Sequence, residues 1–177
     1  MAVTLPPPGK MLLHWSPRSP YVRKVMIAAH EMGLQDQLHC VRTVVGGTTP
    51  HLELMKENPL GKIPTLVLAD GTIIYDSPVV CEYLDGLHSG PKLFPAGPER
   101  ITALRRLALG DGMLDIGLAL LGERFRPAEK QSQPHIDLWR GKLVNCIPAL
   151  EAEADALSAS AFSIGHIAIG IALAYLD

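Results

Sequence analysis

Cysteine is scarce in this sequence, and the cysteines present are not arranged for disulfide or redox chemistry. Cys40, Cys81 and Cys146 are odd in number and widely spaced, and they form no C-x-x-C motif. This pattern fits free thiols in a reducing compartment better than a disulfide framework, so we expect a cytoplasmic protein. We interpret all three cysteines as small hydrophobic residues of the core.

The sequence also has no surplus of basic residues and no apolar run long enough to span a membrane. The formal net charge of the 177 residues is -2, which gives no support for binding to nucleic acid. The N-terminal residues lack the positive-then-apolar pattern of a signal peptide. Residues 161–176 are apolar, but they are fewer than the roughly 20 residues of a membrane span and include His166. We therefore predict a buried helix there and no membrane partner.

The first half of the sequence alternates between strand-like and helix-like segments. Short β-rich runs are separated by a stretch with helical spacing of apolar residues and by Gly- and Pro-containing turns. The predicted strands are 11–15, 39–45, 65–69 and 72–75, and the predicted helices are 22–32, 51–58 and 77–87. This order favours a small mixed sheet with helices on its faces.

The second half is predicted to be entirely helical. Residues 88–98 contain three prolines and two glycines, a composition typical of a linker. The predicted helices beyond it are 99–126, 134–158 and 163–176, the second kinked at Pro148. The change of periodicity divides the chain into an α/β domain (10–88), a linker (89–97) and an all-α domain (98–177).

The first motif with chemical meaning is S-P-Y-V, residues 19–22, between a predicted strand and a predicted helix. Backbone N–H groups at a helix N-terminus lack partners, and the helix dipole is positive there. A cysteine at that place would have a lowered pKa and act as a redox thiol, but this sequence has Ser19. The helix N-terminus is suited to stabilise a thiolate, but Ser19 supplies no sulfur. The sulfur would therefore have to come from a ligand. The alternative is that Ser19 only caps the helix.

The second motif is N-P-L-G-K-I-P-T-L, residues 58–66. Pro64 stands just before a predicted strand and removes one N–H donor. A cis bond before it would leave the backbone of Ile63 extended and exposed, so that a peptide-like ligand could pair with it as an added strand. Any edge strand could begin in this way, so the motif carries little weight alone.

The third motif is Y-D-S-P, residues 75–78, at the start of a predicted helix. Serine suits the N-cap and proline the first turn. The N–H groups and the hydroxyl of Ser77 can hold a carboxylate, and Asp76 can hold an ammonium group. The head of an α-amino acid would satisfy both, although ordinary capping explains either residue taken singly.

The order and spacing of these motifs resemble the cytosolic glutathione S-transferase family, of a serine type similar to bacterial, tau and omega members. S-P-Y-V stands where related glutaredoxins and omega-type transferases carry C-P-Y-C or C-P-F. N-P-x-G-K-I-P resembles the cis-proline loop of the family, Y-D-S-P-V-V-C-E-Y-L its E/D-S motif, and F-S-I-G-H-I-A-I-G-I-A-L-A-Y-L-D its C-terminal anchor helix. The resemblance covers roughly residues 11–177 and implies a thioredoxin-like domain followed by an all-helical domain.

The resemblance also implies a function and a site. The expected activity is transfer of glutathione, as co-substrate and without a metal, to alkyl, aryl or other electrophilic groups in detoxification by a cytoplasmic homodimer. Ser19 would donate a hydrogen bond to the glutathione sulfur, with Ser16 or Arg18 as alternatives. The implied glutathione-binding residues are Ser16, Lys62, Ile63, Pro64 (cis), Asp76 and Ser77. Lys62 could equally be a solvated loop residue.

The sequence departs from the family pattern in two ways. The anchor helix of the family usually begins S/T-x-x-D, a capping box, whereas this chain has Ser163-Ile164-Gly165-His166. A neutral histidine is a poorer partner for the N-cap N–H, so the sequence leaves the reciprocal bond open, and we expect His166 to pack or bond locally rather than to catalyse. Family members also usually continue well beyond this helix, so we expect the last helices of the domain to be missing.

Two other functions compete with catalysis of transfer. A transferase-like protein could bind glutathione or apolar ligands without turnover. A glutaredoxin-type thiol oxidoreductase is the third possibility, but serine at position 19 argues against it. Retention on glutathione resin without activity would favour the first, and disulfide reduction that survives Ser19→Ala would favour the second.

Overall fold

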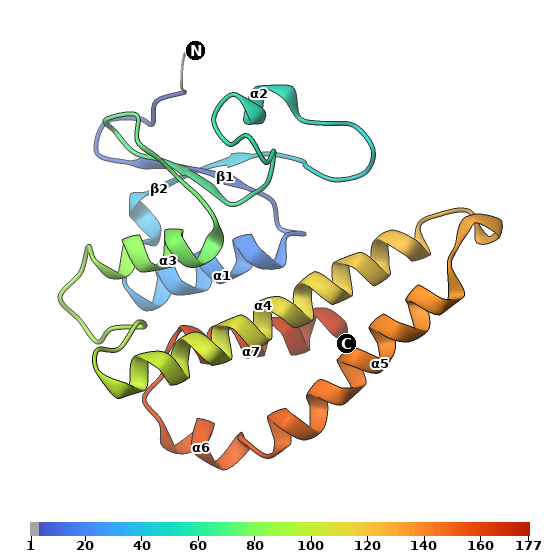
Figure 1. The fold of residues 1–177 in the computed structure, drawn as a ribbon. Coiled ribbons are helices and arrows are strands. Elements are labelled where there is room, and N and C mark those ends of the chain that lie inside the picture. Colours follow the sequence, from blue (N-terminus) through green and yellow to red (C-terminus); the bar gives the residue numbers. More distant parts are fainter. Residues whose placement is uncertain (1–3) are drawn as a thin grey trace. The chain divides into compact units, whose positions relative to one another are not determined.

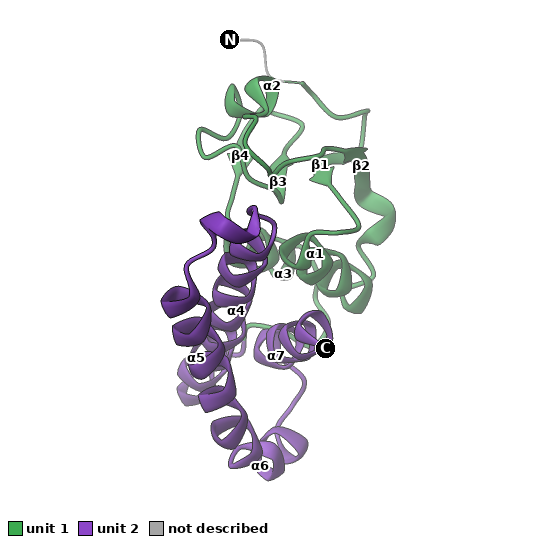
Figure 2. Cartoon of the chain, turned by 90° about the vertical axis from the view of Figure 1, so that its right-hand side faces the viewer, with its two compact units in different colours: residues 1–94 green, residues 95–177 purple. Residues whose placement is uncertain are grey.

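The computed structural model describes residues 4–177, which form two compact units (Figure 2). The first unit ends at Phe94 and the second begins at Pro95, inside the segment 89–97. Within the described residues, no helix combines the length and the apolar character that a membrane span requires.

The first unit is built on a four-stranded mixed sheet with the strand order β2-β1-β3-β4, and all four strands are labelled in Figure 2. Its strands are β1 (Met11–Trp15), β2 (Leu38–Arg42), β3 (Thr65–Val67) and β4 (Ile73–Ile74). β1 is parallel to β2 and antiparallel to β3, and β3 and β4 form a hairpin. Leu13 on β1 pairs with Cys40 on one side and with Leu66 on the other. It is fully buried, as expected for an apolar run in the middle of a sheet.

Helices cover this sheet on both sides. α1 (Pro20–Glu31) and α3 (Ser77–Asp85) pack together on one side, and the short α2 (Leu52–Met55) lies on the other (Figure 1). The 3-10 turn η1 (Gln35–Gln37) follows α1. Gly33 adopts a positive φ of 69° just past α1, a conformation that ends a helix and that glycine adopts without steric cost. The first unit therefore has the α/β arrangement that the sequence predicts.

The second unit consists of helices, and its best-packed pair is α4 (Pro98–Arg124) and α7 (Ile164–Leu176). A Cβ atom built on Gly110 would lie 2.6 Å from the carbonyl carbon of Ala168, so only glycine allows this approach. Ile164 and Ala168 are fully buried, which confirms the buried helix predicted over 161–176. The remaining elements are η2 (Ala128–Lys130), α5 (Gln133–Glu151) and α6 (Ala154–Ala159).

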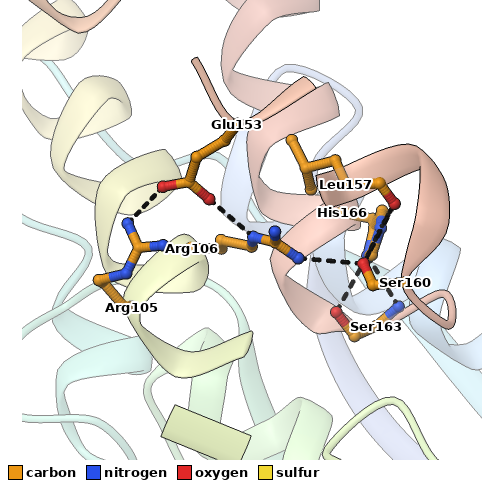
Figure 3. Close-up of polar contacts among 7 residues, drawn as sticks. All are labelled: Arg105, Arg106, Glu153, Leu157, Ser160, Ser163 and His166. Carbon is orange, nitrogen blue, oxygen red and sulfur yellow. Dashed lines mark hydrogen bonds and ion pairs between the residues drawn. The ribbon is translucent and has the colours of Figure 1, made fainter. Parts of the chain in front are cut away.

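The single kinked helix predicted over 134–158 is wrong, because α5 ends at Glu151 and α6 begins only at Ala154. Pro148 lies in the last turn of α5, where it lacks an N–H and obstructs the turn before it. After the break, the carboxylate of Glu153 binds Arg105 and Arg106 of α4, with N–O distances of 2.5 and 2.9 Å (Figure 3). This contact between distant segments holds the chain in its turn and has no local signature in the sequence.

The capping box of α7, which the sequence left open, is complete, and His166 bonds locally as predicted. The Ser163 N–H donates to His166 Nδ1 at 3.1 Å, which is the reciprocal bond of a capping box (Figure 3). An N–H group can only donate, so Nδ1 is the acceptor and Nε2 carries the proton. Nε2 then donates to the carbonyl of Leu157 at 3.1 Å. Histidine thus replaces the acid by accepting at one ring nitrogen and donating at the other.

The prediction that all three cysteines are buried holds only for Cys81. Cys40 is exposed and Cys146 is half-buried. Cys40 lies on β2, which is an edge strand of the sheet, and partial burial of its sulfur raises the pKa of the thiol. Cys146 lies on α5, and its thiol donates to the Lys142 carbonyl at 3.2 Å. None of the three lies at the N-terminus of α1.

Candidate functional site

The N-terminus of α1 presents the hydroxyl of Ser19. Ser19 is the N-cap, in an extended conformation, and its Oγ accepts a hydrogen bond from the Val22 N–H at 3.2 Å. A hydroxyl has two acceptor positions and one proton, so accepting from Val22 leaves the proton for a further acceptor. Capping and donation to a ligand are therefore compatible roles for this residue.

Two other polar residues precede Ser19 in the same turn. The Ser16 hydroxyl accepts a weak hydrogen bond of 3.4 Å from the Arg18 N–H, and the Ser16 carbonyl accepts from the Ser19 N–H at 3.2 Å. The Arg18 side chain is exposed. The turn thus places all three candidate donors within a few residues of the helix end, and only Ser19 has the cap geometry.

The loop that carries Ile63 and Pro64 is fixed from inside by Asn58. The peptide bond between Ile63 and Pro64 is cis. Asn58 is buried, and its amide donates to the Lys62 carbonyl and to Thr65 Oγ1, both at 3.0 Å. Its Oδ1 accepts from the Leu60 N–H at 3.0 Å. One side chain therefore closes the whole loop.

In the described residues, the backbone of Ile63 is unpaired while its side chain is anchored. Within residues 4–177, no hydrogen bond involves the N–H or the carbonyl of Ile63. Its side chain is buried in an apolar cluster with Val22 of α1 and Leu54 of α2. This apolar cluster ties the loop to the first turn of α1, and therefore to Ser19. The Lys62 side chain beside it is exposed.

The third motif begins α3, but its cap is one residue earlier than expected. Asp76, not Ser77, is the N-cap, and its carboxylate accepts from the Ser77 N–H. Asp76 is exposed at the end of the helix, whereas Ser77 is buried. The Ser77 hydroxyl accepts a hydrogen bond from Lys24 Nζ of α1 at 3.2 Å. The structure thus places Ser77 in contact with α1.

The three motifs are joined through α1. Val22 connects this helix to the Ile63 loop, and Lys24 connects it to the start of α3. The groups brought together are a hydroxyl at a helix N-terminus, a backbone segment without a partner in the described residues, and an acid beside a second helix N-terminus. Together they can bind a peptide-like ligand that carries a sulfur and an amino-acid head.

The sequence-based prediction of the site did not include two residues that have a structural role there. Lys24 is wholly buried, and a charged residue inside an amphipathic helix is the signal that could have revealed it. Asn58 stands before Pro59 in the quoted motif, where an asparagine commonly bonds to the backbone of a turn. His14, Thr43 and Glu57 form a further buried polar group, with His14 ring nitrogens 2.8 Å from Thr43 Oγ1 and 2.6 Å from Glu57 Oε2.

Metal ligands do not gather anywhere in the described part of the chain. Between residues 4 and 177, no group of three or more His, Cys, Asp or Glu side chains has a geometry that could hold an ion.

Comparison with known proteins identifies similar proteins along nearly the whole chain. A family model of the glutathione S-transferase N-terminal domain matches residues 18–87. The uncharacterized GST-like protein YibF of Escherichia coli (strain K12) is 31% identical over 172 residues, which are 94% of this chain and 82% of that protein.

Solved structures of glutathione transferases are similar to this chain as well. A glutathione transferase family member from Pseudomonas fluorescens Pf-5 with bound glutathione has a TM-score of 0.91 and 39% identity, covering 95% of this chain and 83% of that one. A glutathione S-transferase from Methylobacillus flagellatus KT with GSH bound has a TM-score of 0.86 and 33% identity, covering 94% of this chain and 83% of that one. These matches confirm a thioredoxin-like fold in the first unit and the helical fold of the second. The chain therefore belongs to the glutathione S-transferase family.

Proposed function

We propose that this protein is a glutathione transferase, which activates the thiol of glutathione for attack on an electrophilic small molecule. The proposal rests chiefly on the way α1 connects the Ser19 hydroxyl, the unpaired backbone of Ile63 and the Asp76 end of α3. The bound glutathione in the similar Pseudomonas and Methylobacillus structures supports the choice of ligand.

In the proposed complex, glutathione lies across the three motifs. The N–H and carbonyl of its cysteinyl unit pair with the backbone of Ile63 beside the cis Pro64. The γ-glutamyl head lies at the start of α3, its amine toward Asp76 and its carboxylate toward the helix N-terminus and Ser77. Lys62 is exposed nearby in sequence and would bind the glycyl carboxylate. Glutathione is the co-substrate, and no metal takes part in the proposed reaction.

The proposed role of Ser19 is to stabilise the thiolate. A hydrogen bond donated to the charged form of a thiol lowers its pKa, and the positive end of α1 acts in the same direction. The thiol proton leaves to solvent, the thiolate attacks the electrophile to form a carbon–sulfur bond, and a leaving group departs with its bonding electrons. The protein contributes position and charge stabilisation rather than a covalent nucleophile.

We further propose the cellular setting that the family resemblance implies. The electrophile is an alkyl, aryl or similar activated compound, and the role is detoxification. The protein acts in the cytoplasm as a homodimer.

The decisive experiment is a conjugation assay with glutathione and a chloronitroaryl electrophile. Wild type is compared with Ser19→Ala, Ser16→Ala and Arg18→Ala, and binding of glutathione to each variant is measured by calorimetry. We expect Ser19→Ala to lower kcat about 100-fold, the effect of removing a donor to a developing or stabilised charge. The other two variants should retain most of the wild-type rate.

Other outcomes distinguish the competing functions. Glutathione binding without turnover on a broad panel of electrophiles would make the protein a non-catalytic glutathione binder. Disulfide reduction that survives Ser19→Ala would make it a thiol oxidoreductase. A loss of rate in Ser16→Ala or Arg18→Ala, but not in Ser19→Ala, would transfer the role to that residue.

A further inference from the structure

The N-terminal turn of α7 depends on the protonation state of one histidine. The Ser163 N–H donates to His166 Nδ1 at 3.1 Å, so this nitrogen has to be without a proton. A protonated ring has a donor at both nitrogens and cannot accept from an N–H group. Histidine is also the side chain whose charge ordinarily changes between about pH 5 and 8, whereas an aspartate in a capping box stays ionised there. The capping box of this chain therefore contains a group that can lose its role at mildly acidic pH.

A proton on His166 would have two unfavourable effects on α7. The Ser163 N–H would lose its acceptor, and Ser163 is buried, so water does not readily replace the lost bond. The ring would also place a positive charge at the N-terminus of a helix, where the dipole is already positive. The protonated Nδ1 could still donate to Ser163 Oγ, which lies 3.0 Å away, but that bond does not satisfy the N–H.

Another positive charge already lies on the far side of Ser160. Arg106 of α4 is buried, and its Nη1 donates to Ser160 Oγ at 3.1 Å. The same oxygen lies 3.4 Å from His166 Nε2, so one hydroxyl separates the guanidinium from the ring (Figure 3). A Cβ atom built on Gly165 would lie 2.7 Å from Arg106 Cβ. The first turn of α7 is therefore packed directly against Arg106, and a second positive charge is unfavourable there.

The acids near this turn do not offset that charge. Hydrogen bonds from Arg105 and Arg106 lower the pKa of Glu153 from 4.5 to about 2, so its charge does not change at mildly acidic pH. Asp155, in the first turn of α6, is exposed to solvent. The sequence of α7 itself contains no Asp, Glu, Lys or Arg. Among the residues drawn in Figure 3, His166 is thus the one whose charge can change between about pH 5 and 8.

We propose that residues 157–166, between α6 and α7, form an acid-sensitive joint, in which one proton on His166 releases the N-terminal turn of α7. At neutral pH the ring accepts from Ser163 and donates to the Leu157 carbonyl, and the joint is closed. The closed joint excludes a proton that the open turn can bind, so its stability rises with pH and is lost as the pH falls. The joint does not involve glutathione, so this inference goes beyond the proposed function and does not rest on it.

The test is amide hydrogen exchange on the full chain, followed by NMR between about pH 7.5 and 5.5 and corrected for the intrinsic pH dependence of exchange. We expect the protection factors of the Ser163, His166 and Ile167 N–H groups to fall about tenfold over this range, the size of a lost helix cap. His166→Asn keeps an oxygen that can accept from Ser163 but does not titrate, so its protection factors should stay level. His39→Asn, which removes an exposed histidine of β2, should behave like wild type.

Two results would overturn the inference. One is a level protection factor for the Ser163 N–H in wild type, and the other is an equal fall in wild type and in His166→Asn, because another group would then be responsible. If His166→Asn does not fold, the His166 ring is titrated by NMR in wild type. Its midpoint must coincide with the loss of Ser163 protection, and separate midpoints also overturn the inference. No measurement here uses glutathione, so such a failure leaves the proposed function standing.

Discussion

At the scale of single residues, the side chains most relevant to the site can form more than one hydrogen bond. Ser19 accepts a hydrogen bond from its own helix and keeps a proton to donate. Asn58 closes a loop with both ends of its amide group. The sequence shows which residue types occur at these places, but the second partner of each depends on geometry. This is why Ser19 could be predicted as a cap or as a donor, and why Asn58 and Lys24 were missed.

The two roles of Ser19 can be separated by substitution. Ser19→Asp keeps an oxygen that accepts from Val22 but has no proton to donate to a thiolate, and its charge repels one. We expect Ser19→Asp to unfold at nearly the wild-type urea concentration while losing most of the conjugation rate. Ser19→Ala should lose both, with an unfolding free energy about 0.5–2 kcal/mol lower. A fast Ser19→Asp enzyme would show that donation by Ser19 is not required.

The carboxylate of Glu153 should make stability depend on pH. Hydrogen bonds from Arg105 and Arg106 lower its pKa from 4.5 to about 2 in the folded protein. The folded state therefore favours the ionised form, and the resulting stability is complete above the unfolded pKa and lost as the pH falls toward 2. Glu153→Gln should flatten this part of the curve of unfolding free energy against pH.

The matched control is Glu151→Gln, an exposed acid at the end of α5. It should leave the acid limb of the curve as steep as in wild type. Identical curves for wild type and Glu153→Gln would show that the contact with the two arginines contributes nothing to stability.

At the scale of elements, most helices and strands could be predicted and their ends could not. The alternating and helical patterns gave each strand of the sheet and α1, α3, α4 and α7. The break between α5 and α6 was missed because Pro148 predicted only a kink, and the contact of Glu153 with α4 after the break joins residues far apart in the sequence. The cap of α3 was misplaced by one residue because Asp and Ser are both good N-cap residues and stand side by side.

The histidine cap of α7 leads to a prediction for this helix. His166→Ala removes the acceptor for the Ser163 N–H and the donor to Leu157, and should lower the free energy of unfolding by about 0.5–2 kcal/mol. His166→Asp introduces the acid that is usual in a capping box, so it should lower the free energy of unfolding by less than His166→Ala does. Urea denaturation of both variants measures the difference. If His166→Ala were as stable as wild type, the cap would be of no energetic consequence.

The close contact between α4 and α7 gives a second prediction at this scale. Gly110→Ala would place a methyl group 2.6 Å from the backbone of Ala168, where the neighbouring atom cannot swing away. We expect a loss of about 1–3 kcal/mol in unfolding free energy, as for other overpacked sites. Gly122→Ala lies on the same helix in open space and should instead stabilise the protein by up to about 1 kcal/mol. Equal effects of the two substitutions would contradict this account.

At the scale of the whole molecule, the fold class and the family were within reach of the sequence. Three short motifs in a fixed order identified the first domain, and the apolar helix at 161–176 supported the second. The spatial links between the motifs were not within reach, because they run through the side chains of Val22 and Lys24, and neither was among the predicted site residues. The composition also could not tell which cysteines are exposed.

Glutathione should stabilise the folded chain. A ligand that binds only the native state at about 100 times its Kd adds about 2.7 kcal/mol, which raises Tm by about 5–10 °C for a chain of this size. Cysteinylglycine, which lacks the γ-glutamyl head, should have a much smaller effect. Differential scanning calorimetry with each ligand tests this, and an unchanged Tm at saturating glutathione would argue against binding.

The apolar cluster of Val22, Leu54 and Ile63 has a practical consequence for mutational screening. These side chains set the spacing between the helix that carries Ser19 and the loop that carries the unpaired backbone of Ile63. A screen for lost conjugation would therefore recover truncations of Val22 and Leu54 together with changes at Ser19, although neither residue offers a polar atom to the ligand. Ranking hits by loss of activity alone would mistake this apolar cluster for part of the binding surface. Measuring protein abundance in parallel would not correct the error for truncated variants that still fold.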